Sequence, residues 1–384
     1  MRIALVAGEA SGDTLGAALI EALRRRFPDA EFAGVAGPKM IAAGCAAWHG
    51  IDELSVMGLT EVISHLPRLL RLRRALRARI REWRPDVFVG VDNKEFNLGL
   101  AKLLKRDGFA TVQYVSPQVW AWRPGRARTI GDSVDLVLCL FPFEPAFYRE
   151  YGVRAAFVGH PLADQIPLHI DKAAARVSLG IAADVRVLAV LPGSRPGEVE
   201  KLAEPFARAA ELLARRFPGL VCIAPMVTDD LRQRFSTRCV AFAPTAAVRM
   251  LAGNARGALA AADVVLVASG TATLETALTQ RPMVVAYRLG AMTAFVLRTF
   301  GLVKVRHFSQ PNLLAGEELV PEFFQEAASP ENLAGALARW LENPAAVANV
   351  TARFARLHES LRCNGAERAA AEIAELVTAR LARP

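Results

Sequence analysis

A short loop in the second half of the chain has the composition of an anion-binding site. Leu191-Pro192-Gly193-Ser194-Arg195 follows an apolar run and precedes a helical pattern. Free N–H groups and the dipole at the start of a helix attract phosphate, and an arginine can add a bidentate contact. The pattern favours a diphosphate site formed by Gly193, Ser194 and Arg195. Alternatively, the same sequence would form a tight turn in which the arginine side chain is only solvated.

A second loop of small residues follows the apolar run 264–268. Ser269, Gly270 and Thr271 would let a ligand approach the end of that strand. Glu275, in the first turn of the helix that follows, could accept hydrogen bonds from both hydroxyls of a ribose. Alternatively, Glu275 only complements the positive N-terminus of its helix.

The first half of the chain contains a candidate general base. Asp92 lies just beyond the apolar run 87–91, at the carboxyl edge where open α/β sheets bind ligands. A carboxylate there could take a proton from a hydroxyl nucleophile. An Asx turn or a helix cap would also place an aspartate there. His160, after the last strand of this half, is more typical of a structural histidine.

Aromatic and basic segments supply two further candidates. Trp120 and Trp122, which follow another strand, could cover a sugar face or an acyl chain, or simply pack in the interior. Residues 66–84 contain eight arginines and the single acid Glu82. Apolar residues recur among them at helical spacing, which suits a membrane interface and equally a helix packed on a sheet. The expected membrane contacts are Leu66, Leu69, Leu72, Leu76, Arg73 and Arg77, although the two arginines interrupt the apolar stripe.

The elements that must position these residues alternate between strand and helix, which predicts a parallel sheet. Expected strands of the first half are 3–7, 87–91, 111–115, 136–140 and 156–158, with a helix over 14–27 that Asp13 would cap. The same rhythm restarts at 187–191 and continues with strands at 221–225, 264–268 and 283–287. We therefore expect two similar α/β domains at 1–168 and 185–340, a linker at 169–184, and C-terminal helices at 341–384 that could cross back to the first domain.

Composition restricts the class of protein. The 384 residues are 53% hydrophobic and 22% charged, which predicts a globular chain, and the net charge of +9 favours anionic partners. Five cysteines without a C-x-x-C pair suggest neither disulfides nor zinc and fit a reducing cytosol. The start of the chain is too short an apolar run for a signal peptide, and no window suits a spanning helix. A dinucleotide fingerprint and a Walker lysine are both missing.

Several of these segments together closely resemble the lipid-A-disaccharide synthase family, glycosyltransferases of outer-membrane lipid A assembly in Gram-negative bacteria. The resemblance runs through most of the chain and rests on the segments Gly8–Asp13, Tyr114–Pro117, Val119–Arg123, Leu191–Arg195, Ala268–Ala272 and Pro311–Gly316. It implies a GT-B fold of the α/β class, with two Rossmann-like doubly wound domains facing a cleft. It also implies an enzyme without a cofactor, and the missing Asp-x-Asp pair predicts no essential metal ion.

The resemblance further implies substrates and site residues. UDP-2,3-diacylglucosamine would be the donor, 2,3-diacylglucosamine 1-phosphate the acceptor, and an inverting transfer would give the β-1,6-linked disaccharide 1-phosphate and UDP. The C-terminal domain would bind the donor through the two loops above, Glu275 and Asn312. The N-terminal domain would supply Asp92 and an acceptor site formed by Glu9, Ser11, Gly12, Asp13, Ser116, Trp120 and Trp122. The family pattern Asp-Ala-Pro-Asp-Phe is here Asp92-Asn93-Lys94-Glu95-Phe96, so Lys94 and Glu95 depart from it.

Two alternatives remain open on the sequence. Another UDP-sugar enzyme, such as a UDP-N-acetylglucosamine epimerase or a lipid-linked-sugar transferase, could share the small-residue loop and Glu275. A basic membrane or nucleic-acid binding module would explain the charge but not the paired loops. We expect no nucleic-acid partner. We expect the protein to be cytoplasmic and to bind peripherally to anionic lipid on the inner membrane. A homo-oligomer is also possible.

Overall fold

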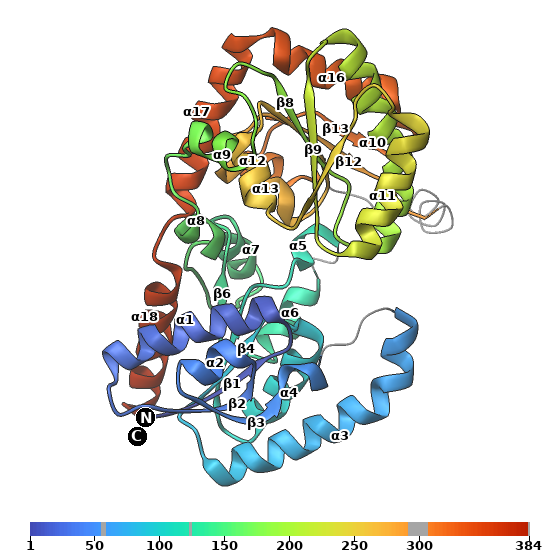
Figure 1. Ribbon diagram of the computed structural model, residues 1–384. Coiled ribbons are helices and arrows are strands. Elements are labelled where there is room, and N and C mark those ends of the chain that lie inside the picture. The colour runs from blue at the N-terminus through green and yellow to red at the C-terminus, as the bar shows by residue number, and fades with distance from the viewer. Residues whose placement is uncertain (55–58, 123–124, 291–305, 383–384) are drawn as a thin grey trace. The chain divides into compact units, whose positions relative to one another are not determined.

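The computed structural model describes residues 1–54, 59–122, 125–290 and 306–382, and within these ranges the side chains of 59–65, 121–122 and 381 are not described. The chain divides into two units (Figure 1). Unit 1 comprises Met1–Asp164 and Leu361–Pro384, and unit 2 comprises Gln165–Ser360.

Unit 1 is built on a parallel seven-stranded sheet in the order β3-β2-β1-β4-β5-β6-β7. Both faces are covered, so the central strands are nearly continuous apolar runs. Ile3 and Leu5 of β1 face one hydrophobic cluster, and Ala4 and Val6 face the other. The strands are β1 (Arg2–Ala7), β2 (Glu31–Ala36), β3 (Cys45–Gly50), β4 (Val87–Val91), β5 (Ala110–Tyr114), β6 (Leu136–Cys139) and β7 (Ala155–Phe157).

Helices cover the two faces of this sheet. One face packs against α1 (Ala10–Arg26), α2 (Pro38–Ala42) and α18 (Gly365–Leu381). The other packs against α3 (Leu59–Trp83), α4 (Lys94–Arg106), α5 (Val119–Trp122), α6 (Arg126–Gly131) and α7 (Glu144–Arg149). The short η1 (Ile51–Glu53) follows β3, and α8 (Pro161–Gln165) lies at the boundary of the units.

The last helix of the chain packs in unit 1. Helix α18 lies beside α1 (Figure 1), and Arg25 donates to Glu367 across 2.7 Å. The backbone N–H groups of Asn364 and Gly365 donate to Asp164, at 2.9 and 2.7 Å. The C-terminal helix is therefore part of the unit that contains the N-terminus.

Unit 2 repeats the architecture with six parallel strands in the order β10-β9-β8-β11-β12-β13. They are β8 (Val187–Leu191), β9 (Val221–Met226), β10 (Arg249–Ala252), β11 (Val264–Ala268), β12 (Met283–Tyr287) and β13 (Glu322–Phe324). One face carries α10 (Pro196–Arg216), α11 (Asp229–Phe242) and α16 (Pro330–Glu342); the other carries α9 (Lys172–Ser178), α12 (Ala255–Ala261), α13 (Thr271–Leu278) and α17 (Pro344–Leu361). Helix α15 (Gln310–Ala315) and η2 (Gln325–Ala327) flank β13.

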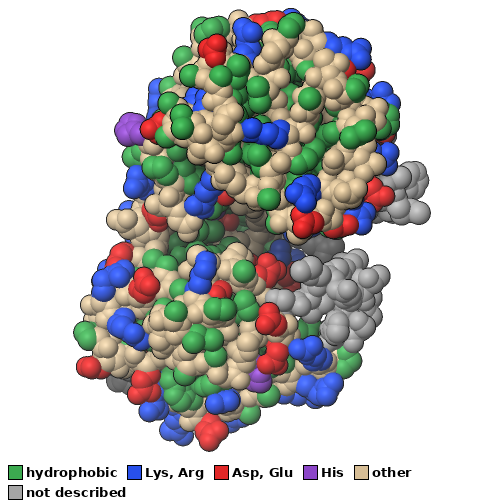
Figure 2. All heavy atoms as spheres, in the orientation of Figure 1, with side chains coloured by type: hydrophobic (Ala, Val, Ile, Leu, Met, Phe, Trp, Pro, Cys, Tyr) green, Lys and Arg blue, Asp and Glu red, His purple; other side chains and the backbone are tan. Residues whose placement is uncertain are grey.

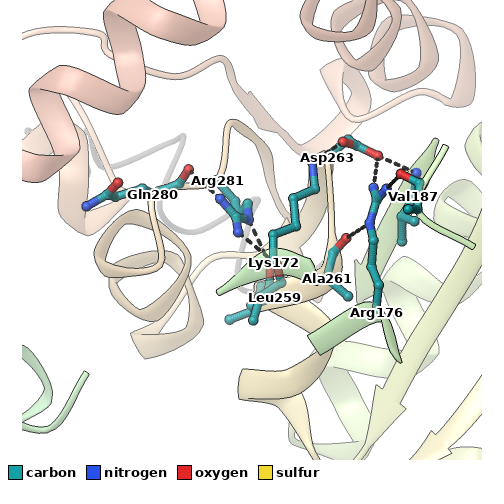
Figure 3. A network of polar contacts seen from close by, with 10 residues as sticks. Lys172, Arg176, Val187, Leu259, Ala261, Asp263, Gln280 and Arg281 are labelled. Carbon is teal, nitrogen blue, oxygen red and sulfur yellow. Dashed lines mark hydrogen bonds and ion pairs between the residues drawn. The ribbon is translucent and has the colours of Figure 1, made fainter. Parts of the chain in front are cut away.

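The segment 169–184, expected as a linker, is an integral part of unit 2. Its helix α9 is attached by Lys172 and Arg176, which both pair with Asp263, at 2.7 Å for Arg176 (Figure 3). Asp263 also accepts from the N–H of Val187 at 2.7 Å, so this carboxylate joins α9 to the start of β8 (Figure 3). Nearby, Arg281 donates to the carbonyls of Leu259 and Ala260, which tie the start of β12 to α12.

Each sheet has one topological switch point. In unit 1 the strand order reverses between β1 and β4, and in unit 2 between β8 and β11. The loops that leave the carboxyl ends of such a strand pair diverge to opposite faces of the sheet, and the crevice between them is the usual ligand site of this fold. The candidate loops after residues 7, 91, 191 and 268 are these four loops.

None of the helices in the described part of the chain is both long and apolar enough to cross a bilayer. On the face displayed in Figure 2, basic and acidic side chains are interspersed over the surface. The excess positive charge is therefore not gathered into one basic surface on that face.

Candidate functional site

The loop after β8 has the expected geometry, and its amides already have a partner. Gly193 adopts a φ of 130°, and a Cβ there would come within 2.6 Å of Glu198. The Glu198 carboxylate accepts from the N–H groups of Ser194 at 3.1 Å and Arg195 at 3.3 Å. The Arg195 side chain is 82% exposed and lies 3.5 Å from the same carboxylate. An anion at these amides must displace Glu198, whereas the guanidinium of Arg195 is accessible.

The loop after β11 lies on the other side of the unit 2 switch point. Ser269 donates through Oγ to the carbonyl of Phe308 at 3.1 Å, while Gly270 and Thr271 are exposed. Gly270 has a φ of 152° and open space where a Cβ would stand. Small side chains thus leave the end of this strand accessible.

Glu275 lies in the second turn of α13 rather than in the expected first turn, because the helix begins at Thr271, and 22% of its side chain is exposed. Burial raises the pKa of its carboxyl, and Arg256, whose Nε lies 3.8 Å from Oε1, opposes that rise. A half-buried carboxylate beside a small-residue loop can accept hydrogen bonds from neutral hydroxyl groups.

Asn312, expected to contact UDP, has a structural role instead. Its side chain is fully buried. Its Nδ2 donates to the carbonyl of Val320 at 2.8 Å and to Glu322 at 2.9 Å. Its Oδ1 accepts from the N–H groups of Leu319 at 2.8 Å and Val320 at 3.0 Å. These four bonds use both amide protons and both lone pairs, so the expectation is corrected.

Asp92 is positioned at the unit 1 switch point by buried polar groups. Its backbone has a φ of 56°, and Asn93 follows with 26°, a conformation that costs free energy and often marks functional sites. The Asp92 carbonyl accepts from Gln113 at 2.9 Å and from Asn97 at 3.1 Å. Its carboxylate accepts from Ser11 Oγ at 3.2 Å. Asn93 is the N-cap residue of α4, so Asp92 is not that cap.

The first turn of α1, just after β1, supplies Ser11 and a close-packed glycine. Glu9 is exposed and stands at the N-cap position of α1. Gly12 is buried, and a Cβ on it would lie 3.5 Å from the Cβ of Asp92. The structure thus brings Ser11, Gly12 and Asp92 together.

Asp13 differs from both expectations made for it. Helix α1 begins at Ala10, so Asp13 is not its N-cap but lies inside its first turn and is 3% exposed. Its carboxylate caps α2 by accepting from the backbone N–H groups of Gly37, Lys39 and Met40 at 3.0, 2.9 and 3.0 Å. These bonds assign Asp13 a structural role rather than an acceptor contact.

The segment after β5 forms a buried polar network that the sequence did not reveal. Ser116 donates to the hydroxyl of Tyr148 at 3.1 Å, and Trp120 donates through Nε1 to Glu144 at 3.2 Å. Burial raises the pKa of Glu144 to about 7, although hydrogen bonds from the N–H of Phe141 and from Trp120 oppose that rise. The side chain of Trp122 lies outside the described residues. No glycine-rich loop precedes Glu144, so the sequence gives no sign of this buried carboxyl, and only its burial in the structure reveals it.

His160 is structural, as its sequence position indicated. It stacks on Phe141 with ring centroids 5.6 Å apart, and its Nδ1 accepts from the N–H of Leu162 at 3.2 Å. Burial lowers its pKa to about 4, which keeps the imidazole neutral at pH 7.

Helix α3 corrects the expected membrane contacts. Leu72 and Leu76 are 7% and 0% exposed and pack in the hydrophobic core against the sheet, with Leu69 partly buried beside them. Arg77 makes a bidentate pair with Asp107 at 2.7 and 2.6 Å, and Arg73 lies over the ring of Phe96. Among the described side chains of α3, the exposed large apolar residues are Leu66 and Leu70, at 50% and 40%. Of the other expected membrane contacts, the leucines pack toward the interior of unit 1, and the two arginines interact with Asp107 and Phe96.

Potential metal ligands do not cluster: among the described residues no group of three or more His, Cys, Asp or Glu side chains could hold an ion.

Two solved structures share this architecture. The chain is similar in structure to the kitacinnamycin glycosyltransferase, with a TM-score of 0.61 and 19% identity over 98% of each chain. It is similar to UDP-GlcNAc 2-epimerase from Neisseria meningitidis bound to UDP-GlcNAc, with a TM-score of 0.66 and 11% identity over 98% of this chain and 100% of that chain. At these identities the likeness establishes the GT-B fold alone.

Sequence comparison identifies the family. Lipid-A-disaccharide synthase of Alkalilimnicola ehrlichii is 54% identical over 97% of this chain and 98% of the relative. The Xanthomonas campestris pv. campestris (strain 8004) enzyme of the same name is 51% identical over 99% of this chain and 87% of the relative. The family model for lipid-A-disaccharide synthetase matches residues 3–373. The chain therefore belongs to the lipid-A-disaccharide synthase family of glycosyltransferases.

Proposed function

We propose that this chain condenses UDP-2,3-diacylglucosamine with 2,3-diacylglucosamine 1-phosphate, releasing UDP and the β-1,6-linked disaccharide 1-phosphate. The observation that carries the proposal is Asp92, held at positive φ at the unit 1 switch point with Ser11 on its carboxylate. The family membership supports the class of reaction, and the two switch-point loops of unit 2 support a nucleotide donor in that unit.

In the proposed step the acceptor 6-hydroxyl attacks the anomeric carbon of the donor. A new C–O bond forms as the bond to UDP breaks on the opposite face, which inverts the configuration at that carbon. Asp92 takes the hydroxyl proton, and the leaving diphosphate keeps the electron pair of the broken bond. A positioned base typically contributes a factor of about 10²–10⁴ to such a step.

Unit 2 supplies the proposed donor site. Arg195 meets the charge that develops on the departing diphosphate, because its guanidinium is exposed at the switch point. Ser269, Gly270 and Thr271 leave room for the nucleotide, and the half-buried carboxylate of Glu275 accepts from the ribose hydroxyls. We propose that these groups act without a metal ion.

Unit 1 supplies the proposed acceptor site and the contact with lipid. Ser11 and Gly12 lie beside Asp92, while Ser116 and Trp120 belong to the segment after the neighbouring strand β5, with Trp120 in α5. The exposed end of α3, with Leu66, Leu70 and the exposed arginines Arg68, Arg71 and Arg74, would rest on the anionic cytoplasmic face of the inner membrane.

Incubation of the purified protein with both diacylated sugars tests the proposal. Mass spectrometry should detect the tetraacyl disaccharide 1-phosphate and one UDP for each disaccharide, with unchanged rates after chelation by EDTA. UDP release without disaccharide, or dependence on a divalent ion, would contradict it. Incubation with UDP-N-acetylglucosamine alone covers the second candidate, because an epimerase of the structurally similar kind would equilibrate the sugar without an acceptor.

A further inference from the structure

A cavity in unit 1 has no part in the mechanism above. It opens between α4 and α6, has a volume of about 240 Å³, and has Pro117 from the loop after β5 in its wall. Lys94 and Lys102 reach it from one face of α4, two turns apart, and Arg126 reaches it from the first position of α6. The cavity is therefore lined by three cations from two helices.

These cations are free, whereas their neighbours are paired. Among the described residues, no hydrogen bond or ion pair engages the side chains of Lys94, Lys102 or Arg126. By contrast, Lys105 on the same helix pairs with Asp135 at 3.2 Å and donates to two carbonyls. The one carboxylate in the lining is Glu95, so the lining side chains carry two net positive charges.

The chemistry of this lining suits a phosphate monoester. Such a group carries close to two negative charges at neutral pH. Two ammonium groups and one guanidinium can surround it with charge-assisted hydrogen bonds, which are the strong ones. The hydroxyl of Thr129 and the N-terminus of α4 add polar groups at the same cavity.

Residues that line the cavity directly follow residues of the proposed acceptor site in the chain. Lys94 and Glu95 begin α4, directly after Asp92 and Asn93, and Pro117 follows Ser116 in the loop after β5. In a glucosamine 1-phosphate, C1 and C5 both flank the ring oxygen, so the 1-phosphate and the 6-hydroxyl lie along the same side of the sugar. A sugar whose 6-hydroxyl meets Asp92 therefore places its phosphate near the segment after β4, where Lys94 and Pro117 line the cavity.

We propose that this cavity binds the 1-phosphate of the acceptor, with Lys102 and Arg126 as determinants of specificity and Lys94 as a third contact. The inference rests on the proposed function, because it takes the acceptor from it. It gives a role to Lys94, one of the two positions where the chain departs from the family pattern.

The test compares two pairs of substitutions on the same helices. Lys102→Gln with Arg126→Gln removes two cations from the cavity. Arg106→Gln with Arg128→Gln removes two exposed cations from α4 and α6 that do not line it. Each variant is assayed with the acceptor 1-phosphate and with a diacylglucosamine methyl glycoside, which lacks the phosphate.

The cavity variant should raise KM for the phosphorylated acceptor about tenfold or more, the usual loss for a charge-assisted hydrogen bond. Its kcat, its affinity for UDP and its KM for the methyl glycoside should stay within about twofold of the parent. The control pair should leave all of these values near the parent's. An unchanged KM, an equal rise in the control pair, or an equal rise with the methyl glycoside would overturn the proposal.

Two further measurements separate other outcomes. If the parent forms no disaccharide, the proposed function fails, and calorimetry with glucosamine 1-phosphate alone decides on the cavity. Binding that the cavity variant loses would support it; no binding, or equal binding, would overturn it. If the variant loses binding to phosphatidylglycerol vesicles while its acceptor KM is unchanged, the cations serve a membrane phosphodiester instead, which also overturns the proposal.

Discussion

The hydroxyl of Ser11 donates to the carboxylate of Asp92 across 3.2 Å, and this bond joins the first turn of α1 to the loop that follows β4. The two residues are far apart in the chain, yet parallel pairing of β1 with β4 brings the segments that follow these strands to one sheet edge. The backbone carbonyl of Asp92 is held at the same time by Gln113 and Asn97. Rigid placement of this kind is what a general base requires, because proton transfer depends on a fixed distance to the hydroxyl.

The first prediction concerns Asp92 itself. Asp92→Asn keeps the size of the side chain and removes its basicity, so kcat should fall by about 10²–10⁴ while the protein remains folded. Steady-state kinetics and thermal unfolding of the purified variant measure both effects.

Glu95→Gln is the matched control for Asp92→Asn, because it neutralises a nearby exposed carboxylate three residues along the chain. It should leave kcat within a factor of a few. The reverse result, a large loss for Glu95→Gln and none for Asp92→Asn, would transfer the role of base to Glu95.

The second prediction concerns the nucleotide. Arg195→Ala and Glu275→Ala should each weaken UDP binding about tenfold or more, because each removes a hydrogen bond to a charged group. Isothermal calorimetry with UDP measures this directly. Arg238→Ala, an exposed arginine on α11, provides the control and should bind UDP as the parent does. Parent-like affinity in both site variants would place the nucleotide elsewhere.

The two-domain α/β fold was predictable because its signal is local and strong. Strands β8, β11 and β12 match the expected residues from end to end, since strands covered on both faces read as continuous apolar runs. Strands β2, β3, β10 and β13 were not predicted from the sequence. They are rich in alanine, glycine or charged residues, or are only three residues long. Their pairing with neighbouring strands stabilises them, and no local pattern carries that information.

The candidate site was predictable in its loops and less so in its side chains. A glycine or serine loop after an apolar run marks a strand end, so the four switch-point loops could be located. A polar side chain that serves the protein's own backbone looks the same in sequence as one that waits for a ligand. Asn312 and Asp13 are of the first kind, and only their hydrogen bonds reveal it.

The third prediction concerns Glu144 and pH. Its pKa in the folded protein is raised from 4.5 to about 7 by burial, so the folded state holds this proton more tightly than the unfolded state. The resulting stability is fully present below about pH 4.5 and is lost as pH rises through about 7. Glu144→Gln keeps the shape and the neutral form, and should remove this dependence, which corresponds to a change of about 2–3 kcal/mol.

Urea unfolding of parent and Glu144→Gln at pH 5 and pH 8 measures this change. The free energy of unfolding of the parent relative to the variant should be lower at pH 8 than at pH 5. The same difference at both values would show that Glu144 is ionised in the folded protein throughout this range.

The fourth prediction separates the two faces of α3. Leu66→Ser with Leu70→Ser changes exposed residues, and should therefore weaken binding to anionic vesicles while leaving the free energy of unfolding and UDP affinity unchanged. Leu76→Ala changes a fully buried residue, and should instead destabilise unit 1 by about 2–5 kcal/mol. Vesicle sedimentation and urea unfolding measure the two effects separately.

Salt should weaken vesicle binding of the parent only in part, because it screens the exposed arginines and leaves apolar insertion intact. Undiminished sedimentation of the Leu66→Ser, Leu70→Ser variant would exclude this end of α3 as the membrane contact, whatever Leu76→Ala does to stability.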